Sequence, residues 1–240
     1  MPTRILLISD IHANYPALEA VARQCNAETF DIILNCGDST VYATFPNGTL
    51  DWLRDNDALS ILGNTDKKVL KLLKGKVLKK PRMAEKRVMY TWTAQHLTPD
   101  NRKFLAAMKT RALVECEGCR IGLFHGSPEN DDEFLFYDTP ATRFQELARK
   151  TDCDIVLIGH SHSPFHKKVN NVHFINPGSV GRMFDKNPEA SYATIEISPD
   201  SIKVRLFRCP YNIDKVIQGL MSNLLPPIYE KMYLSGQKLN

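Results

Sequence analysis

Five short polar motifs in this chain each stand at the end of an apolar run that is typical of a buried strand. Together they carry seven side chains that can bind a metal ion: Asp10, His12, Asp38, Asn64, His125, His160 and His162. Oxygen and nitrogen ligands that converge from several strand ends can hold two metal ions around a shared carboxylate, which activates water for attack on phosphorus. The pattern therefore predicts a two-metal phosphoester hydrolase.

The first third of the chain alternates apolar runs with helical patterns. We expect strands at 4–9, 31–35 and 58–62, and helices at about 16–24 and 50–56. A repeat of strand, loop and helix predicts a largely parallel sheet, and sites in such sheets form at the carboxyl ends of the strands. The first three polar motifs lie at those ends.

The second half of the chain changes to antiparallel hairpins, around one more buried strand at 155–158. The expected hairpins pair 112–116 with 120–124, 165–169 with 172–175, and 191–197 with 202–207. No linker or repeat divides the chain. We therefore expect one domain over residues 1–240, with a helical insertion at 67–110 that partly covers the site and a helical tail at 211–240.

The composition is that of an ordinary globular protein, with 43% hydrophobic and 24% charged residues. No apolar run approaches the ~18 to 20 residues of a membrane span, and the first residues lack the apolar core of a signal peptide. We therefore expect a cytoplasmic protein without a membrane partner. The six scattered cysteines suit reduced thiols, and a hairpin turn between Cys116 and Cys119 is favoured over a metal or redox site.

A basic stretch follows the third motif. Ten lysine and arginine residues lie between Lys67 and Arg87, where Glu85 is the only acidic residue. A solvated helix and loop is the favoured interpretation. The alternative is a basic rim that attracts a polyanion toward the metals, since the stretch begins just after Asn64. The net charge of the chain is only +4, and a nucleic-acid partner is not indicated.

The types of ligand residue indicate the class of metal. A mixture of carboxylate, imidazole and amide oxygen suits two divalent or trivalent transition metal ions, with Mn as the first expectation and Fe, Zn, Ni or Co as alternatives. It does not suit an all-oxygen site for Ca or Mg. One histidine after a strand is usually structural. Three strand ends that carry histidine, together with two aspartates and one asparagine, are hard to explain by packing alone.

In this order the motifs resemble those of the calcineurin-like metallophosphoesterase superfamily, and most of all its short bacterial and archaeal phosphodiesterase branch. The segment 176–181, Asn-Pro-Gly-Ser-Val-Gly, extends the resemblance to about residue 182. The resemblance implies an α/β fold, a four-layer α-β-β-α sandwich with mixed sheets. It also implies one metal held by Asp10, His12, Asp38 and His162, and another held by Asp38, Asn64, His125 and His160. We expect the catalytic residues to include Asp38, Asn64 and His125.

One departure from the superfamily bears on the reaction. Many of its phosphomonoesterases have Gly-Asn-His-Glu, whose histidine can protonate the leaving group, whereas this chain has Thr65 at that position. Since general acid catalysis contributes about 10² to 10⁴ in rate, the change favours substrates with a good leaving group. Thr65, His96 and Arg182 are the candidates for substrate binding. For His96 a structural or exposed role is favoured over that of a substitute acid, and for Arg182 a surface role is equally compatible.

The leading hypothesis is a phosphodiesterase that cleaves a phosphodiester or nucleotide polyphosphate by attack of a metal-bridging hydroxide. A broad phosphomonoesterase or protein phosphatase is one alternative. Another is a non-catalytic scaffold similar to the retromer subunit of vesicle sorting, which has the same apparent fold and an impaired metal site. Competent residues at all seven ligand positions favour catalysis. The expected partner is a small phosphorylated, nucleotide-like substrate, and the chain is compatible with a homo-oligomer.

Overall fold

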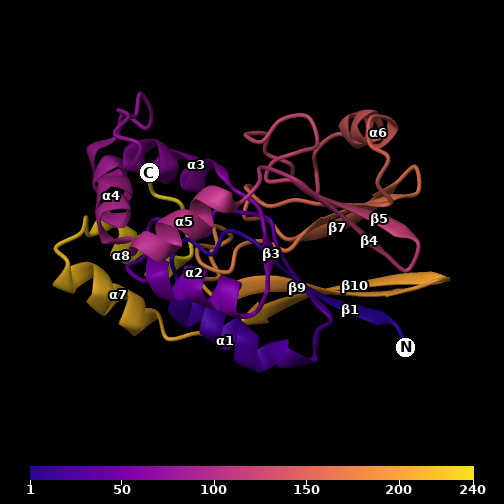
Figure 1. The fold of residues 1–240 in the computed structure, drawn as a ribbon, viewed down its shortest axis with the longest axis horizontal. Coiled ribbons are helices and arrows are strands. Elements are labelled where there is room, and N and C mark those ends of the chain that lie inside the picture. The colour runs from indigo at the N-terminus through magenta and orange to yellow at the C-terminus, as the bar shows by residue number, and fades with distance from the viewer.

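Two five-stranded sheets pack face to face in the computed structural model, which describes all 240 residues (Figure 1). The first sheet contains β1 (Thr3–Ile8), β2 (Ile32–Asn35), β3 (Leu59–Ser60), β9 (Ala190–Ser198) and β10 (Ser201–Cys209), in the order β10-β9-β1-β2-β3. The second contains β4 (Ala112–Cys116), β5 (Cys119–Leu123), β6 (Ile155–Leu157), β7 (Phe165–Val169) and β8 (Val172–Asn176), in the order β4-β5-β6-β8-β7. Both sheets mix parallel and antiparallel pairs.

Helices cover the outer faces of both sheets. On the side of the first sheet, one apolar core is shared by α1 (Tyr15–Cys25), η1 (Ala27–Thr29), α2 (Pro46–Asp55), α3 (Asn64–Leu73), α4 (Ala84–His96), α5 (Pro99–Ala107), α7 (Ile213–Ser222) and α8 (Ile228–Ser235). Among these helices α1 packs directly on β9 and β10, whereas α3, α4, α7 and α8 gather at one end of the sandwich (Figure 1). The second sheet is covered by α6 (Ala141–Arg149) alone, at the upper right of Figure 1. The result is the four-layer α-β-β-α sandwich that the resemblance implied, and this prediction is confirmed.

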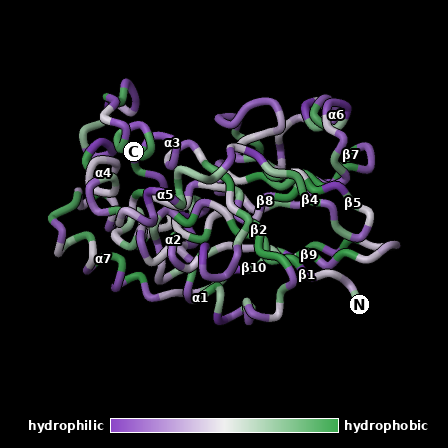
Figure 2. Tube along the Cα trace, viewed as in Figure 1, coloured by the Kyte–Doolittle hydropathy of each residue, from purple (hydrophilic) through white to green (hydrophobic).

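The alternation of side chains along the central strands explains the layers. In β1, Ile5 lies in the core between the sheets, whereas Leu6 lies in the core under the helices. In β6, Leu157 lies between the sheets and Val156 packs toward α6. Figure 2 shows the corresponding concentration of apolar residues along both sheets. Strands that are apolar on both faces fit a sheet buried on both sides.

Most of the expected elements are present, with two shifts at the site. The expected strand at 58–62 is short, because Ile61 forms only an isolated bridge to Lys109 and the chain then turns into α3 at Asn64. The expected helix at 50–56 begins earlier, at Pro46, whose fixed φ suits a first turn. Inside the expected insertion, Thr98 caps α5 by accepting a hydrogen bond from the Asn101 backbone N–H.

The three expected hairpins are confirmed, and the turns of the first two, at 117–118 and 170–171, use residues in the left-handed region. Cys116 and Cys119 face each other across the first turn, and all six cysteines are free thiols. In the tail, α7 and α8 meet near Pro226, and residues 236–240 return toward α3 and α4 (Figure 1). None of the helices combines the length and the apolar character that crossing a bilayer requires.

Candidate metal centre

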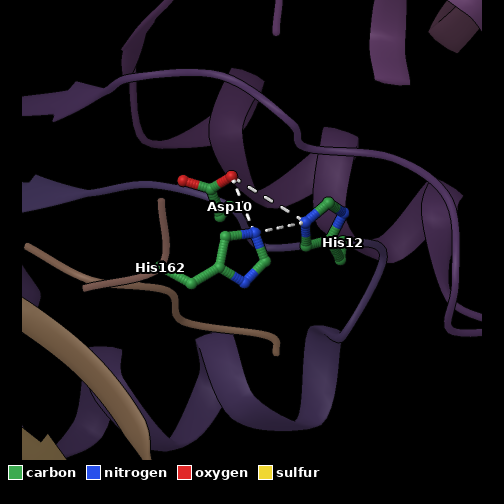
Figure 3. A group of neighbouring side chains, drawn as sticks. All are labelled: Asp10, His12 and His162. Atoms are coloured by element: carbon green, nitrogen blue, oxygen red, sulfur yellow. Dashed lines mark hydrogen bonds and ion pairs between the residues drawn. The ribbon is translucent and has the colours of Figure 1, made fainter. Parts of the chain in front are cut away.

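The five polar motifs meet at one end of the sandwich, and both sheets contribute. Asp10 and His12 follow β1, Asp38 follows β2, and Asn64 is the first residue of α3. From the second sheet, His125 follows β5, and His160 and His162 follow β6. Two groups have potential ligand atoms within 4.8 Å of one another: Asp10 with His12 and His162, and Asp10 with Asp38 and His125. Figure 3 shows the side chains of the first group pointing toward a common centre.

The two carboxylates lie between the imidazole rings. Asp10 Oδ1 is 3.2 Å from His162 Nε2 and 3.8 Å from His12 Nε2. Asp38 Oδ2 is 3.9 Å from His12 Nε2 and 3.5 Å from His125 Nε2, so it lies near both groups. His160 Nδ1 is 3.1 Å from His125 Nε2. The structure therefore brings these six residues together. Asn64, the seventh expected ligand, lines the cavity that opens above them.

The outer nitrogen of three of these rings faces a backbone carbonyl. His125 Nδ1 is 2.8 Å from Cys36 O, His12 Nδ1 is 3.4 Å from Thr40 O, and His162 Nδ1 faces Arg182 O. These contacts favour a proton on Nδ1, which directs the Nε2 lone pairs inward. His12 Nε2 and His162 Nε2 then lie 3.1 Å apart with their lone pairs facing each other.

One buried acceptor in the centre, Asp10 Oδ1, lacks a hydrogen-bond partner within the protein. Since buried polar atoms are nearly always paired, this orphaned oxygen beside the facing lone pairs of His12 and His162 indicates a site built for cations. The donor set of carboxylate oxygen and imidazole nitrogen fits transition metal ions.

The electrostatics give most of these groups the protonation state of a ligand. Burial raises the pKa of Asp10, but His162 and His125 together outweigh it and lower the value to about 2. Burial lowers the pKa of His12 to about 3, and burial together with His125 lowers that of His160 to about 4. His125 differs, because Asp38 outweighs the effect of burial and raises its pKa to about 9. This proton must leave when a metal binds.

The ligand loops have unusual backbone conformations. Five of the seven expected ligands have positive φ: Asp10, His12, Asp38, His160 and His162. Such conformations are uncommon for residues other than glycine, and they concentrate at functional sites. Glycines permit the close approach of the loops. A Cβ on Gly63 would lie 2.1 Å from Asp38 Oδ1, and one on Gly159 would lie 2.0 Å from Ser9 Oγ.

Asp66 is a supporting residue that the sequence analysis missed. Its buried carboxylate accepts hydrogen bonds from the backbone N–H groups of Gly63, Ser39 and Thr40, at 3.0, 3.1 and 3.0 Å, and from Thr40 Oγ1 at 2.6 Å. It thereby joins the loop of Asp38 to the start of α3. An acidic residue at the third position of a helix was the available signal.

The segment 176–181 supports the loops from the other side. Ser179 Oγ donates to Asp10 O at 2.6 Å, and Asn176 Nδ2 donates to Gly159 O at 2.8 Å. The backbone N–H of Gly181 donates to the same Asp10 carbonyl at 3.1 Å. The segment 176–181 therefore holds the loops from β1 and β6 together.

A cavity of about 590 Å³ opens above the centre. Its lining includes six basic residues and five aromatic residues: Lys68, Lys80, Arg82, Lys86, Arg182 and Lys238, with Tyr42, Tyr90, Phe134, Phe136 and Phe184. Thr65 also lines it, so two of the three candidates for substrate binding, Thr65 and Arg182, lie in the cavity. Lys238 comes from the returning tail, and sequence patterns could not predict that it lines the cavity.

His96 lies elsewhere, and its candidacy for substrate binding needs correction. It is the last residue of α4, is exposed, and does not line the cavity. Its ring stacks on Trp92 at 4.1 Å, and its Nδ1 is 2.7 Å from Trp92 O. These contacts within one turn of helix hold the ring away from the centre, in the structural role that the sequence favoured.

The basic stretch between Lys67 and Arg87 divides between two environments. Lys68, Lys80, Arg82 and Lys86 line the cavity. By contrast, Lys67 pairs with Asp131 at 2.5 Å, and Arg87 donates to the carbonyls of Leu78 and Pro81. Neither a purely solvated face nor a continuous basic rim describes the stretch.

Comparisons with known proteins agree with this geometry. The family model described as "Calcineurin-like phosphoesterase superfamily domain" matches residues 3–200. An uncharacterised protein of Methanocaldococcus jannaschii is 29% identical over 248 residues, which cover 96% of this chain and 97% of that protein. The structure of a metallophosphoesterase from Sphaerobacter thermophilus is 25% identical and matches with a TM-score of 0.81, covering 98% of this chain and 100% of the other.

A hypothetical protein from Pyrococcus horikoshii matches with a TM-score of 0.87 at 18% identity, covering 98% of this chain and 99% of the other, and this likeness shows the fold alone. The family model spans well over half of the chain and includes all five motifs. This chain therefore belongs to the calcineurin-like phosphoesterase superfamily.

Proposed function

We propose that this protein is a metal-dependent phosphoesterase that hydrolyses phosphodiester or nucleotide polyphosphate bonds at a pair of metal ions. Membership of the superfamily supports the general class of phosphoester hydrolase. The observation that carries the proposal is the convergence of buried carboxylates and imidazoles from both sheets, with the orphaned acceptor Asp10 Oδ1 at the centre.

Asp10, His12, Asp38 and His162 would hold one ion, and Asp38, Asn64, His125 and His160 the other. The position of Asp38 Oδ2 near both His12 and His125 supports its role as the shared ligand. When bound, such ions polarise a phosphoryl oxygen and lower the pKa of a water to near neutral. The chain's own contribution is to fix the ligands before substrate arrives, through Asp66, Ser179 and the carbonyls behind the histidine rings.

The absence from the cavity of a histidine outside the proposed ligand set supports a substrate with a good leaving group. Thr65 Oγ1 donates to Thr40 O at 3.4 Å, and a threonine hydroxyl does not ionise at neutral pH. The histidines that line the cavity are His12, His160 and His162, which all belong to the proposed ligand set. An alkyl monoester, which needs its leaving oxygen protonated, fits this site poorly.

Two phenylalanines support a nucleotide-like substrate. Phe134 and Phe136 line the cavity with 51% and 40% of their surfaces exposed, and their rings are nearly parallel, with an interplanar angle of 7°. Exposed aromatic faces offer platforms on which a base can stack, whatever its identity. Phe134 also stacks on His160 at 4.1 Å, so a base held there would lie beside the metal centre.

The decisive experiment measures hydrolysis of bis-p-nitrophenyl phosphate, glycerol phosphate and diadenosine tetraphosphate by the Mn-loaded protein. We expect activity on the diester and the polyphosphate to exceed that on glycerol phosphate, and chelation to abolish it. A preference for glycerol phosphate would instead support a phosphomonoesterase. No hydrolysis of any substrate by protein that retains its metal would support a scaffold, for which no contact in this structure provides specific support.

A further inference from the structure

We propose that Arg182, Lys86 and Lys238 form an anion subsite beside the metal centre, and that it binds a second phosphoryl group of the substrate. The preferred substrate would then carry at least two linked phosphoryl groups, one at the metals and one in the subsite. This proposal rests on the proposed function and narrows it, since a simple diester would leave the subsite empty.

Arg182 is the anchor of the subsite. Its side chain is almost fully buried, with 7% exposure, and its guanidinium lies over the rings of Tyr42, Phe184 and Tyr229 at 3.9, 5.3 and 5.5 Å. No carboxylate lies within ion-pair distance of the guanidinium, which donates a hydrogen bond to the sulfur of Met232. Aromatic faces offset only part of the cost of burying a charge, so an anion is the missing partner.

The position of Arg182 brings its positive charge close to the proposed metal ligands. The backbone carbonyl of Arg182 faces His162 Nδ1, which places the residue directly behind a proposed ligand. Its side chain lines the cavity together with His162. An anion held by the guanidinium would therefore sit next to the metals rather than at the rim.

Lys86 and Lys238 bring two more positive charges to the same place. Both line the cavity, and neither forms an ion pair. Lys238 Nζ is 5.9 Å from the rings of both Phe134 and Phe184. The Phe134 and Phe184 rings stack on His160 and His162 at 4.1 and 4.4 Å. Lys238 therefore lies above the metal centre, beside the two phenylalanine rings that cover it.

The three cations line one cavity, and Arg182 and Lys238 lie 5.3 and 5.9 Å from the centre of the same Phe184 ring. The pKa of Lys86 is lowered by burial first, and then by the charges of Lys238 and Arg182. Like charges that converge without a carboxylate repel each other, and a phosphoryl group with several negative oxygens relieves that repulsion. A planar guanidinium and two ammonium groups match such oxygens in geometry and charge.

The buried arginine distinguishes this arrangement from ordinary solvated lysines. Lys80, Arg82 and Lys238 are exposed and Lys86 is half-buried, so water can reach these four side chains. Arg182 has no such access, and Tyr42 and Tyr229, which enclose it, belong to the protein core. The buried anchor therefore distinguishes a binding subsite from a basic surface.

The test compares AMP with α,β-methylene-ADP, which differ by one phosphoryl group and share the same base. Binding to the Mn-loaded protein is measured by titration calorimetry in excess Mn. We expect the wild-type protein to bind α,β-methylene-ADP at least about tenfold more tightly than AMP, because charge-assisted hydrogen bonds are strong. Arg182→Gln, Lys86→Gln and Lys238→Gln should each reduce this ratio several-fold. Arg205→Gln, an exposed arginine on β10, is the matched control and should leave the ratio unchanged.

Lys86→Gln and Lys238→Gln alter cavity-lining side chains outside the core, so they test the subsite even where Arg182→Gln does not fold. Equal affinity of the wild-type protein for the two nucleotides, or an unchanged ratio in both lysine variants, would overturn the subsite. Hydrolysis of bis-p-nitrophenyl phosphate is followed in parallel. Wild-type activity on that diester combined with equal nucleotide affinities would reject the subsite alone, whereas inactivity would reject the proposed function and leave the affinity ratio to be judged separately.

Discussion

The floor and the cover of the cavity differ in how their side chains are partnered. The floor consists of the ligand loops 10–12, 38–40, 125 and 159–162, and the cover of residues 68–86, 134–136, 182–184 and 236–240. In the floor, most polar atoms have protein partners, and the unpaired Asp10 Oδ1 lies among the proposed ligands. In the cover, cations line the cavity without carboxylates. The floor is thus suited to binding metal ions, whereas the cover is suited to selecting an anionic substrate.

The largest effect should come from the charge at the middle of the floor. Asp38→Asn removes the carboxylate that lies near both His12 and His125, so we expect hydrolysis to fall by about 10²-fold or more. Metal analysis should show fewer than two ions per chain. Asp200→Asn, in the turn between β9 and β10, is the control and should retain both metal and activity. An active Asp38→Asn protein with two ions would show that another residue, such as Asp10, is shared.

Asp66 tests whether the floor depends on its supports. Asp66→Ala leaves four buried donors without an acceptor, so we expect the free energy of unfolding to drop by about 3 kcal/mol, with weaker metal binding. Urea denaturation measures the first quantity, and Asp152→Ala, at an exposed position, serves as the reference. A change within about 0.5 kcal/mol would assign the rigidity of the floor to other contacts.

Thr65 lies on the boundary between floor and cover, and its replacement asks whether an acid there changes the reaction. Its backbone N–H donates to Asp38 Oδ1 at 2.8 Å, and the residue lines the cavity. Thr65→His should raise turnover of glycerol phosphate by about tenfold, since a proton becomes available to the leaving group. Thr65→Val removes the hydroxyl without supplying an acid, and it should give no such gain. Equal turnover by both variants would place the leaving group away from position 65.

The smallest effect should come from two lysines of the cavity wall outside the proposed subsite, the half-buried Lys68 and the exposed Lys80. Lys68→Gln with Lys80→Gln removes two charges from the cavity wall and should lower kcat/KM for diadenosine tetraphosphate by about three- to tenfold. The loss should shrink as salt rises, because exposed charges are screened over about 8 Å at physiological ionic strength. The matched pair Lys74→Gln with Lys76→Gln lies on exposed chain outside this wall. Similar losses for both pairs would reduce the stretch to a solvated face.

The floor was largely predictable from sequence, and the cover was not. The floor residues follow apolar strands closely along the chain, so local sequence patterns are enough to locate Asp10, Asp38 or His160. Their positive φ angles were not predictable, because they depend on contacts such as that between Gly63 and Asp38. Sequence patterns also carried no sign that the rings around Arg182 would come from positions 42, 184 and 229. Such contacts arise only when distant helices and loops pack.

The origin of the ligands in both sheets has a consequence for the order of events during synthesis. A nascent chain that has reached residue 124 contains Asp10, His12, Asp38 and Asn64, but none of the histidines of the second sheet. His12 and His162, whose rings face each other, are 150 positions apart. Contacts between such distant positions form late, because loop closure must precede them. Metal loading would therefore come after assembly of both layers, and a bound pair of ions would mark a chain that has finished folding.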